Sequence, residues 1–267
     1  MAKFYRLMKY LFLGGILILV YSLCEPYFLK ITPYQLKNKA FSDIKIVFAA
    51  DFHVAPYIWE KWRLQKIIDT INAQKPDLVI LGGDYVNRHT PNTTMAPTEI
   101  AKALQKIKAP KIAVLGNHDS YYGKNNIKKA LKNADIPVLD NQNIKFIIHN
   151  KEFVVAGVAD YYTDKPDIDK ALTETSAPTI FVTHSPDVFP QLKNQTFALA
   201  LAGHTHGGQI ALPFIGALFV PSDFGRRYTG GIYRENNKPL IVSTGLGTSL
   251  LPLRFNNRPE IVVIEFK

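Results

Sequence analysis

The chain has 267 residues, of which 47% are hydrophobic and 20% are charged, and it carries a formal net charge of +10 at pH 7. This composition is typical of a globular protein with a sizeable core, and the single cysteine excludes a fold that depends on disulfides. Residues 1–40 contribute +5 of the net charge. The rest of the chain is therefore too weakly basic for charge alone to indicate nucleic-acid binding.

An apolar segment dominates the N-terminus. Residues 11–24 (LFLGGILILVYSLC) contain no charged residue and follow Lys3, Arg6 and Lys9. As a helix, this run is about 21 Å long, which is shorter than the ~30 Å hydrocarbon core of a bilayer. No signal-peptidase pattern follows it, and Leu23 disfavours lipid attachment at the adjacent cysteine. We therefore favour an uncleaved membrane anchor over a removed signal peptide or a buried helix.

The anchor defines the expected domain organisation. Residues 1–40 are expected to form the anchor and a linker, with residues 1–30 in contact with membrane lipid. Residues 41–267 are expected to form one globular domain. Basic residues stand on both sides of the apolar run, so their distribution does not set which side of the membrane the domain occupies.

From residue 44 onward, short apolar runs typical of strands alternate with helical patterns. Strands are expected at residues 44–50, 77–83, 111–116, 143–150, 151–160, 179–183, 197–202, 207–212, 240–244 and 260–266, and helices at 59–74, 98–108, 124–132 and 167–175. The early alternation predicts a parallel sheet, and the strand-rich second half predicts another sheet packed on the first. The expected fold is therefore α/β, with two packed mixed β-sheets flanked by helices.

Polar clusters follow five of these strands. They are Asp51-Phe52-His53, Asp84, Asn117-His118-Asp119, His184 and His204-Thr205-His206. Because ligand sites in open α/β sheets lie beyond the carboxyl ends of the strands, we expect the five clusters to converge at one edge. Any one of them alone would also suit an ordinary turn or a solvated strand end.

The donor set indicates a metal site. Carboxylate, amide and imidazole groups without a cysteine suit Mn, Fe or Zn, and there are too many of them for one ion. Two ions that share one carboxylate would use them all. In Asp51-x-His53 and His204-x-His206 the two side chains share a face while the chain is extended, which predicts extended backbone at both pairs. The glycines around the second pair would let the backbone approach the metals closely.

In this order and spacing, the clusters resemble the motifs of the calcineurin-like metallophosphoesterase superfamily: DFH, GDYVN, GNHD, THSPD and GHTHGGQ, within residues 51–209. The C-terminal GLGTSLLPLRFNNRPEIVVIEF resembles the end of a bacterial, membrane-associated branch that is similar to UDP-2,3-diacylglucosamine pyrophosphatases. Asn87 stands where many relatives have Asp. The resemblance implies the metallophosphoesterase β-sandwich and a location at the bacterial inner (cytoplasmic) membrane.

The resemblance also implies roles for individual residues. Two divalent metal ions, with Mn favoured and Fe or Zn as alternatives, would be held by Asp51, His53 and His206 at one position, by Asn117, His184 and His204 at the other, and by Asp84 between them. His118 would contact the phosphate or protonate the leaving oxygen, and Asp119 would orient the His118 ring.

Signals for the substrate are weaker. A guanidinium can bind phosphate through two hydrogen bonds, so Arg226, Arg227 and Arg254 are predicted as substrate contacts. Solubility at the surface or an ordinary ion pair explains these arginines equally well. Tyr57, Trp59 and Trp62 are interpreted either as contacts to lipid or a hydrophobic substrate, or as core residues.

Three further polar residues are expected outside the site. His89 and His149 are interpreted as surface residues, and Asp160 is interpreted as a turn cap.

The favoured function is a membrane-anchored dinuclear phosphoesterase, expected as a monomer, that hydrolyses an amphiphilic phosphodiester or pyrophosphate. The best substrate candidate is UDP-2,3-diacylglucosamine, which would yield 2,3-diacylglucosamine 1-phosphate and UMP in lipid A biosynthesis. Alternatives are a phosphodiesterase acting on another envelope lipid, a cyclic nucleotide or nucleic acid, and a membrane-tethered metal-binding scaffold without turnover. Nucleic acid is not expected as a partner.

Overall fold

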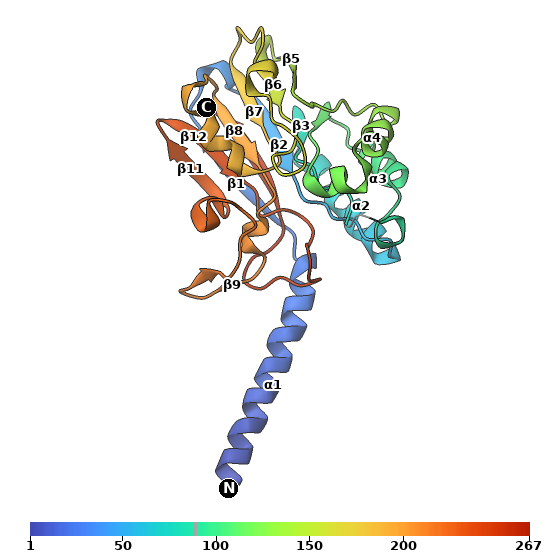
Figure 1. Ribbon diagram of the computed structural model, residues 1–267, viewed down its shortest axis with the longest axis vertical. Coiled ribbons are helices and arrows are strands. Elements are labelled where there is room, and N and C mark those ends of the chain that lie inside the picture. The colour runs from blue at the N-terminus through green and yellow to red at the C-terminus, as the bar shows by residue number, and fades with distance from the viewer. Residues whose placement is uncertain (88–89) are drawn as a thin grey trace.

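A single long helix projects from an α/β body in the computed structural model, which describes residues 1–87 and 90–267 (Figure 1). The helix, α1 (Ala2–Cys24), has 23 residues and is therefore about 34 Å long. The segment Lys3–Tyr27 has a mean hydropathy of 2.0 and is almost entirely exposed. The helix thus extends through the basic N-terminal residues and is longer than the apolar run alone suggested. It is a candidate membrane anchor by length and composition.

The first sheet has five strands, in the order β1 (Lys30–Leu36), β13 (Glu260–Phe266), β2 (Lys45–Ala49), β3 (Leu78–Leu81) and β4 (Lys111–Ala113). The pairs β2–β3 and β3–β4 are parallel, as the early strand–helix alternation predicts, whereas β13 returns antiparallel to β2. The outer face is covered by α2 (Ile58–Ala73), α3 (Pro97–Leu104) and α4 (Asn117–Asn133).

The second sheet has six strands, in the order β11 (Gly231–Glu235), β12 (Lys238–Val242), β8 (Leu199–Ala202), β7 (Thr179–Val182), β6 (Lys151–Gly157) and β5 (Gln142–Ile148). Its outer face packs on the short helix α5 (Ile168–Ala171) and on a 3-10 segment, η4 (Pro186–Asn194). The fold is therefore the predicted pair of mixed sheets flanked by helices.

Shorter elements connect these layers. They are the 3-10 turns η1 (Glu25–Tyr27), η2 (Lys39–Phe41), η3 (Pro91–Thr93), η5 (His206–Gly208) and η6 (Gly225–Tyr228), and a small hairpin of β9 (Ala211–Leu212) and β10 (Gly216–Ala217). The strand expected at residues 207–212 is thus mostly a turn, because Gly207 and Gly208 both adopt positive φ.

Alternate side chains of the central strands serve two cores. In β2, Val47 and Ala49 face the helices, while Ile46 and Phe48 face the second sheet. Because both faces are covered, the strand reads as a continuous apolar run rather than an alternating one. The helix predicted at residues 59–74 forms as α2, and its apolar side chains, including Leu64 and Ile68, are buried against the first sheet.

The first sheet begins earlier than the expected boundary between residues 40 and 41. Strand β1 lies inside the segment expected to be a linker, and it pairs in parallel with β13 along its full length. Pro33 removes one backbone donor, which is tolerated at the edge of a sheet. The exposed and half-buried residues of this edge strand hide it from a search for apolar runs.

An aromatic cluster between the two sheets supplies a test of the fold. Phe153 is fully buried and packs against Phe41 and Phe146, with ring centroids 5.3 and 5.7 Å away. We expect Phe153→Ala to lower the free energy of unfolding by about 3–5 kcal/mol, because it leaves a cavity in the core. Chemical denaturation in detergent measures this. Ile147→Ala, at an exposed position of the neighbouring strand, is the control and should stay within about 0.5 kcal/mol.

Candidate metal centre

The five predicted clusters meet at the carboxyl ends of β2, β3, β4, β7 and β8. Backbone hydrogen bonds join the loops that carry them: Asp51 N–H donates to Gly83, and His53 N–H donates to the Asp84 carbonyl. Gly203 N–H donates to the His184 carbonyl across the second sheet. The convergence at one sheet edge therefore occurs as predicted.

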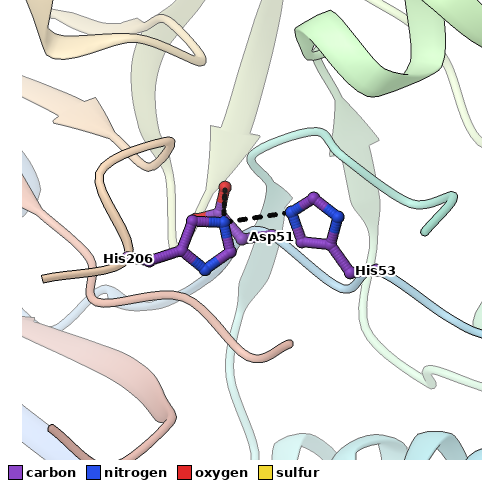
Figure 2. Close-up of side chains that lie close together, drawn as sticks. All are labelled: Asp51, His53 and His206. Carbon is purple, nitrogen blue, oxygen red and sulfur yellow. Dashed lines mark hydrogen bonds and ion pairs between the residues drawn. The ribbon is translucent and has the colours of Figure 1, made fainter. Parts of the chain in front are cut away.

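Asp51, His53 and His206 form the first group of possible metal ligands (Figure 2). The Nε2 atoms of the two imidazoles lie 3.0 Å apart, and His206 Nε2 lies 3.8 Å from Asp51 Oδ1. All three side chains are buried. Two ring nitrogens and a carboxylate oxygen thus point to one small volume.

Asp84 lies between this group and a second one formed with His184 and His204. Its Oδ2 is 3.4 Å from His53 Nε2 and 3.2 Å from His184 Nε2. Its Oδ1 accepts a hydrogen bond from the His118 N–H. A single carboxylate oxygen therefore faces ligands of both groups, which is the position expected of a bridge.

Among the described residues, the buried side-chain atoms without a hydrogen bond include two from the second predicted ligand set. They are His184 Nε2 and Asn117 Oδ1, and both are good metal ligands. Buried polar atoms are normally paired, so an unpaired amide oxygen, together with an imidazole nitrogen that faces the Asp84 carboxylate at 3.2 Å, fits a site built for a cation. The second nitrogen of His184 lies 2.8 Å from the Gly82 carbonyl, which sets the orientation of the ring.

The backbone that presents these ligands is left-handed rather than extended. The φ angles are positive at five ligand candidates, namely Asp51 (57°), His53 (42°), Asp84 (53°), His204 (69°) and His206 (52°). The expectation that each Asp-x-His or His-x-His pair shares a face of an extended chain is therefore wrong. The side chains converge because each loop reverses sharply after its strand, at a cost of about 1–3 kcal/mol per residue.

Close approach of backbone to the ligands explains two glycines. A Cβ on Gly203 would lie 2.7 Å from Asp51 Oδ2, and a Cβ on Gly116 would lie 2.2 Å from Asp84 Oδ1. Both positions therefore exclude any larger residue.

His118 lies at the rim of the site but is not oriented by Asp119, contrary to expectation. Its Nδ1 is 2.9 Å from the Asn87 carbonyl, and its ring packs edge-on against His53. Asp119 is fully buried and accepts hydrogen bonds from the N–H groups of Asp84, Tyr85 and Gly116. Asp119 thus stabilises the Asp84 loop. The Asn87 carbonyl, rather than Asp119, orients the His118 ring.

The protonation of the site without metal follows from burial. Desolvation raises the pKa of Asp51 to about 7 and lowers the pKa values of His53 and His204 to about 3. Burial acts against charge on Asp84 and His184 as well. Their mutual attraction is stronger, so the pKa of Asp84 falls well below its usual range and that of His184 rises well above.

None of the three arginines predicted as substrate contacts reaches the centre of the site. Arg254 is fully buried and donates to the carbonyls of Thr244, Gly247 and Asn257, with its Nη2 3.4 Å from His206 Nδ1. It supports the C-terminal loop and the His206 ring instead.

The other two arginines lie on the exposed surface. Arg227 pairs with Glu235, and Arg226 donates to the Ile215 carbonyl. Their positions fit the alternative interpretation as surface residues.

One contact of the site was missed from the sequence. The ring of Tyr162 stacks on His204 with centroids 4.8 Å apart, while its hydroxyl donates to Asp187. The sequence did contain a signal for this contact, because Tyr162 lies two residues after Asp160, which itself follows an apolar strand.

The remaining polar residues lie largely where expected. Asp160 accepts from the N–H groups of Tyr162 and Thr163, which confirms the predicted turn cap. His149 is exposed, and His89 lies outside the described residues.

A comparison with known proteins agrees with this geometry. The family described as calcineurin-like phosphoesterase matches residues 44–208, a range that contains every ligand candidate. The chain belongs to the calcineurin-like phosphoesterase family. Family membership and the groups of possible metal ligands make the chain a metal-dependent phosphoester hydrolase. This does not agree with the alternative of a scaffold without turnover.

Relatives of full length are similar to the whole chain. It is 33% identical over 254 residues to the uncharacterized metallophosphoesterase YkuE of Bacillus subtilis, covering 91% of this chain and 87% of that protein. It is 34% identical over 251 residues to the phosphodiesterase YaeI of Escherichia coli, covering 91% and 90%. These relatives support the superfamily and phosphodiesterase activity, but not the narrower branch of UDP-2,3-diacylglucosamine pyrophosphatases.

More distant likeness is limited to the fold. A putative 5′-nucleotidase from Staphylococcus aureus superposes with a TM-score of 0.51 at 13% identity, over 77% of this chain and 49% of that chain.

The perturbed pKa values predict how metal binding depends on pH. Asp51, with a pKa of about 7, and the protonated His184 must both lose a proton to bind a cation. We expect the affinity of the metal-free protein for Mn²⁺ to fall as the pH is lowered from about 8 to about 6, with release of protons. Calorimetric titration in buffers of different ionisation enthalpy measures this, and binding without proton release would contradict it.

Proposed function

We propose that this protein is a membrane-anchored phosphodiesterase whose two divalent metal ions act on an amphiphilic phosphodiester or pyrophosphate at the bacterial cytoplasmic membrane. One observation carries the proposal: a groove leads from the ligand cluster to the end of the apolar helix. The protein is proposed to work as a monomer, since one chain supplies both the cluster and the groove.

The groove has a volume of about 770 Å³. Its lining includes His53 and Asn87 of the ligand cluster and its rim, and also Leu23, Pro26 and Tyr27 at the end of the apolar helix. A lipid whose acyl chains stay near the helix can therefore extend its headgroup to the ligand cluster. A cyclic nucleotide needs no such path, and the weakly basic body offers little to a polynucleotide.

Aromatic and aliphatic side chains form much of the wall between the two ends. Tyr57 and Trp59 stack with ring centroids 4.6 Å apart, and Leu246, Leu250 and Leu251 lie on the C-terminal loop. A groove that combines apolar side chains with polar groups suits an amphiphilic ligand.

The residues at the polar end have separate roles in this proposal. Asp51, His53 and His206 would hold one ion, Asn117, His184 and His204 the other, and Asp84 would bridge them. When bound, the two cations supply positive charge to the phosphate oxygens and acidify the attacking water. Mn²⁺ is the proposed metal, because the ligands are imidazole, carboxylate and amide groups without thiolate.

His118 is the proposed general acid. It is half-buried at the rim, beside His53 and close to Asp84, so it can face both substrate and solvent. The Asn87 carbonyl fixes Nδ1 as the donor when the ring is neutral, and protonation of Nε2 then supplies the proton that the leaving oxygen needs.

The phosphodiester class agrees with the name of YaeI, and UDP-2,3-diacylglucosamine is the specific substrate we propose to test. It combines two acyl chains with a pyrophosphate, which matches a groove lined by both apolar side chains and polar groups, including His53 of the ligand cluster.

Two substitutions separate metal binding from proton transfer. We expect Asp84→Ala to lose both metals and all activity, because its carboxylate faces both ligand groups. His118→Ala should retain the metals and lose about 10²–10⁴-fold in kcat. Metal analysis combined with hydrolysis of bis-p-nitrophenyl phosphate measures both effects. Equal, metal-independent rates for His118→Ala and the unchanged protein would contradict the assignment.

The substrate proposal is tested with a pair of tryptophans on one helix. Trp59 lines the groove, whereas Trp62 lies outside it and is more exposed. We expect Trp59→Ala to raise KM for UDP-2,3-diacylglucosamine in mixed micelles by about 10-fold, because it loses roughly 1–2 kcal/mol of apolar contact. Trp62→Ala is the control.

Release of UMP is the readout, and bis-p-nitrophenyl phosphate reports the intact metal site. Hydrolysis of the water-soluble ester with no release of UMP would remove this substrate. The same test with diacyl phosphodiesters would then decide between another envelope lipid and a soluble substrate.

A further inference from the structure

The hairpin that follows the His204-Thr205-His206 motif exposes apolar side chains to solvent. Residues 209–222 (QIALPFIGALFVPS) contain no charged residue. The apolar hairpin, which we define as residues 210–219, nevertheless exposes its largest side chains to solvent: Phe214, Ile215, Leu218 and Phe219. Phe214 at the tip is fully exposed. Clustered exposure of this kind marks a surface that contacts another apolar phase.

The metal site does not explain this exposure. Only two residue pairs join β9 to β10, and Leu218 N–H donates to the Ile210 carbonyl to close the base. The large side chains at and beyond the tip project away from the core clusters of the protein. The exposed Phe214 and Ile215 bury little apolar area within the protein itself, so an external apolar partner would account for their position.

The hairpin is fixed next to the end of α1. Ala211 N–H donates to the Phe255 carbonyl, and Phe255 N–H donates to the Gln209 carbonyl. The Phe255 ring packs edge-on against Tyr21 of α1, and Arg254 N–H donates to the Ser22 carbonyl. In Figure 1 the hairpin with β9 lies at the same end of the body from which α1 projects.

Charge around this end of the body fits a lipid headgroup layer. Arg226 is exposed and donates to the Ile215 carbonyl at the hairpin, and Arg258 is exposed and donates to the Phe28 carbonyl just after α1. Cations beside exposed apolar side chains are typical of segments that lie in a membrane interface, since they meet anionic headgroups there. The apolar hairpin lies next to the apolar helix α1, and this continuity favours a lipid bilayer over a protein partner.

We propose that the apolar hairpin is a second membrane contact, which inserts its tip into the headgroup and acyl boundary of the bilayer next to α1. Two contacts fix the rotation of the body about the helix axis, which a single helix cannot do. They hold the mouth of the groove, with Leu23 and Leu251 on its wall, against the lipid surface.

Depth-dependent quenching tests the insertion on the full-length chain in vesicles that contain anionic lipid. Cys24→Ser removes the single native thiol, and Phe214→Cys then carries an environment-sensitive NBD label. Ile147→Cys carries it in the matched control, because Ile147 is also an exposed apolar residue but lies on β5, at the end of the body remote from α1 (Figure 1). Phe219→Cys is a second position on the hairpin.

The expected result is at least about twofold quenching of the labels at 214 and 219 by lipids that carry a nitroxide near the headgroup, with the label at 147 unchanged. Equal exposure of all three labels to aqueous iodide would overturn the proposal. A second outcome would also overturn the proposal. If the label at 214 is insensitive to nitroxide lipid but is shielded from iodide, and this shielding grows with the density of protein in the vesicles, a second copy of the chain covers the hairpin. The readout needs no substrate and does not depend on the proposed activity.

Discussion

The structure depends on the burial of two carboxylates within reach of four imidazoles. Asp51 and Asp84 are both removed from water, and no arginine or lysine among the described residues forms an ion pair with either. Burial drives Asp51 toward its protonated form, whereas Asp84 is held charged by His184. Burying so many ionisable groups in a core without a cation costs folding free energy. The same features become favourable once divalent cations neutralise the carboxylates, so the fold and the cofactor are energetically linked.

The loops accept this arrangement through local strain and local support. Five ligand candidates occupy left-handed backbone, and several glycines leave space against carboxylate oxygens. Asp119 and Arg254 then connect these loops by hydrogen bonds to backbone groups. Buried ionisable residues near the site are thus divided between ligands and supports, and both kinds are needed to hold strained turns in one conformation.

Much of this could be predicted from the sequence, for identifiable reasons. Strands such as Lys45–Ala49 are continuous apolar runs, and polar residues directly after them converge by topology alone. Edge strand β1 was missed because only one of its faces is covered. The contact of His118 with the Asn87 carbonyl, instead of with Asp119, was missed because sequence spacing does not reveal which backbone groups a buried carboxylate will accept. Arg254 could not be placed either, since burial of a guanidinium depends on carbonyls supplied by a folded loop.

The contact between the apolar helix and the C-terminal loop has a consequence for any shortened form of the protein. Glu25 is completely buried and accepts the N–H groups of Asn256 and Asn257, and the Asn257 side chain in turn donates to the His206 carbonyl. The last turn of the helix is therefore part of the scaffold of a ligand loop. A detergent-free fragment, whether engineered or shed by a protease, has to keep Ser22 and Glu25. A cut made after them would remove the carboxylate that accepts the N–H groups of Asn256 and the buried Asn257, next to the His206 loop.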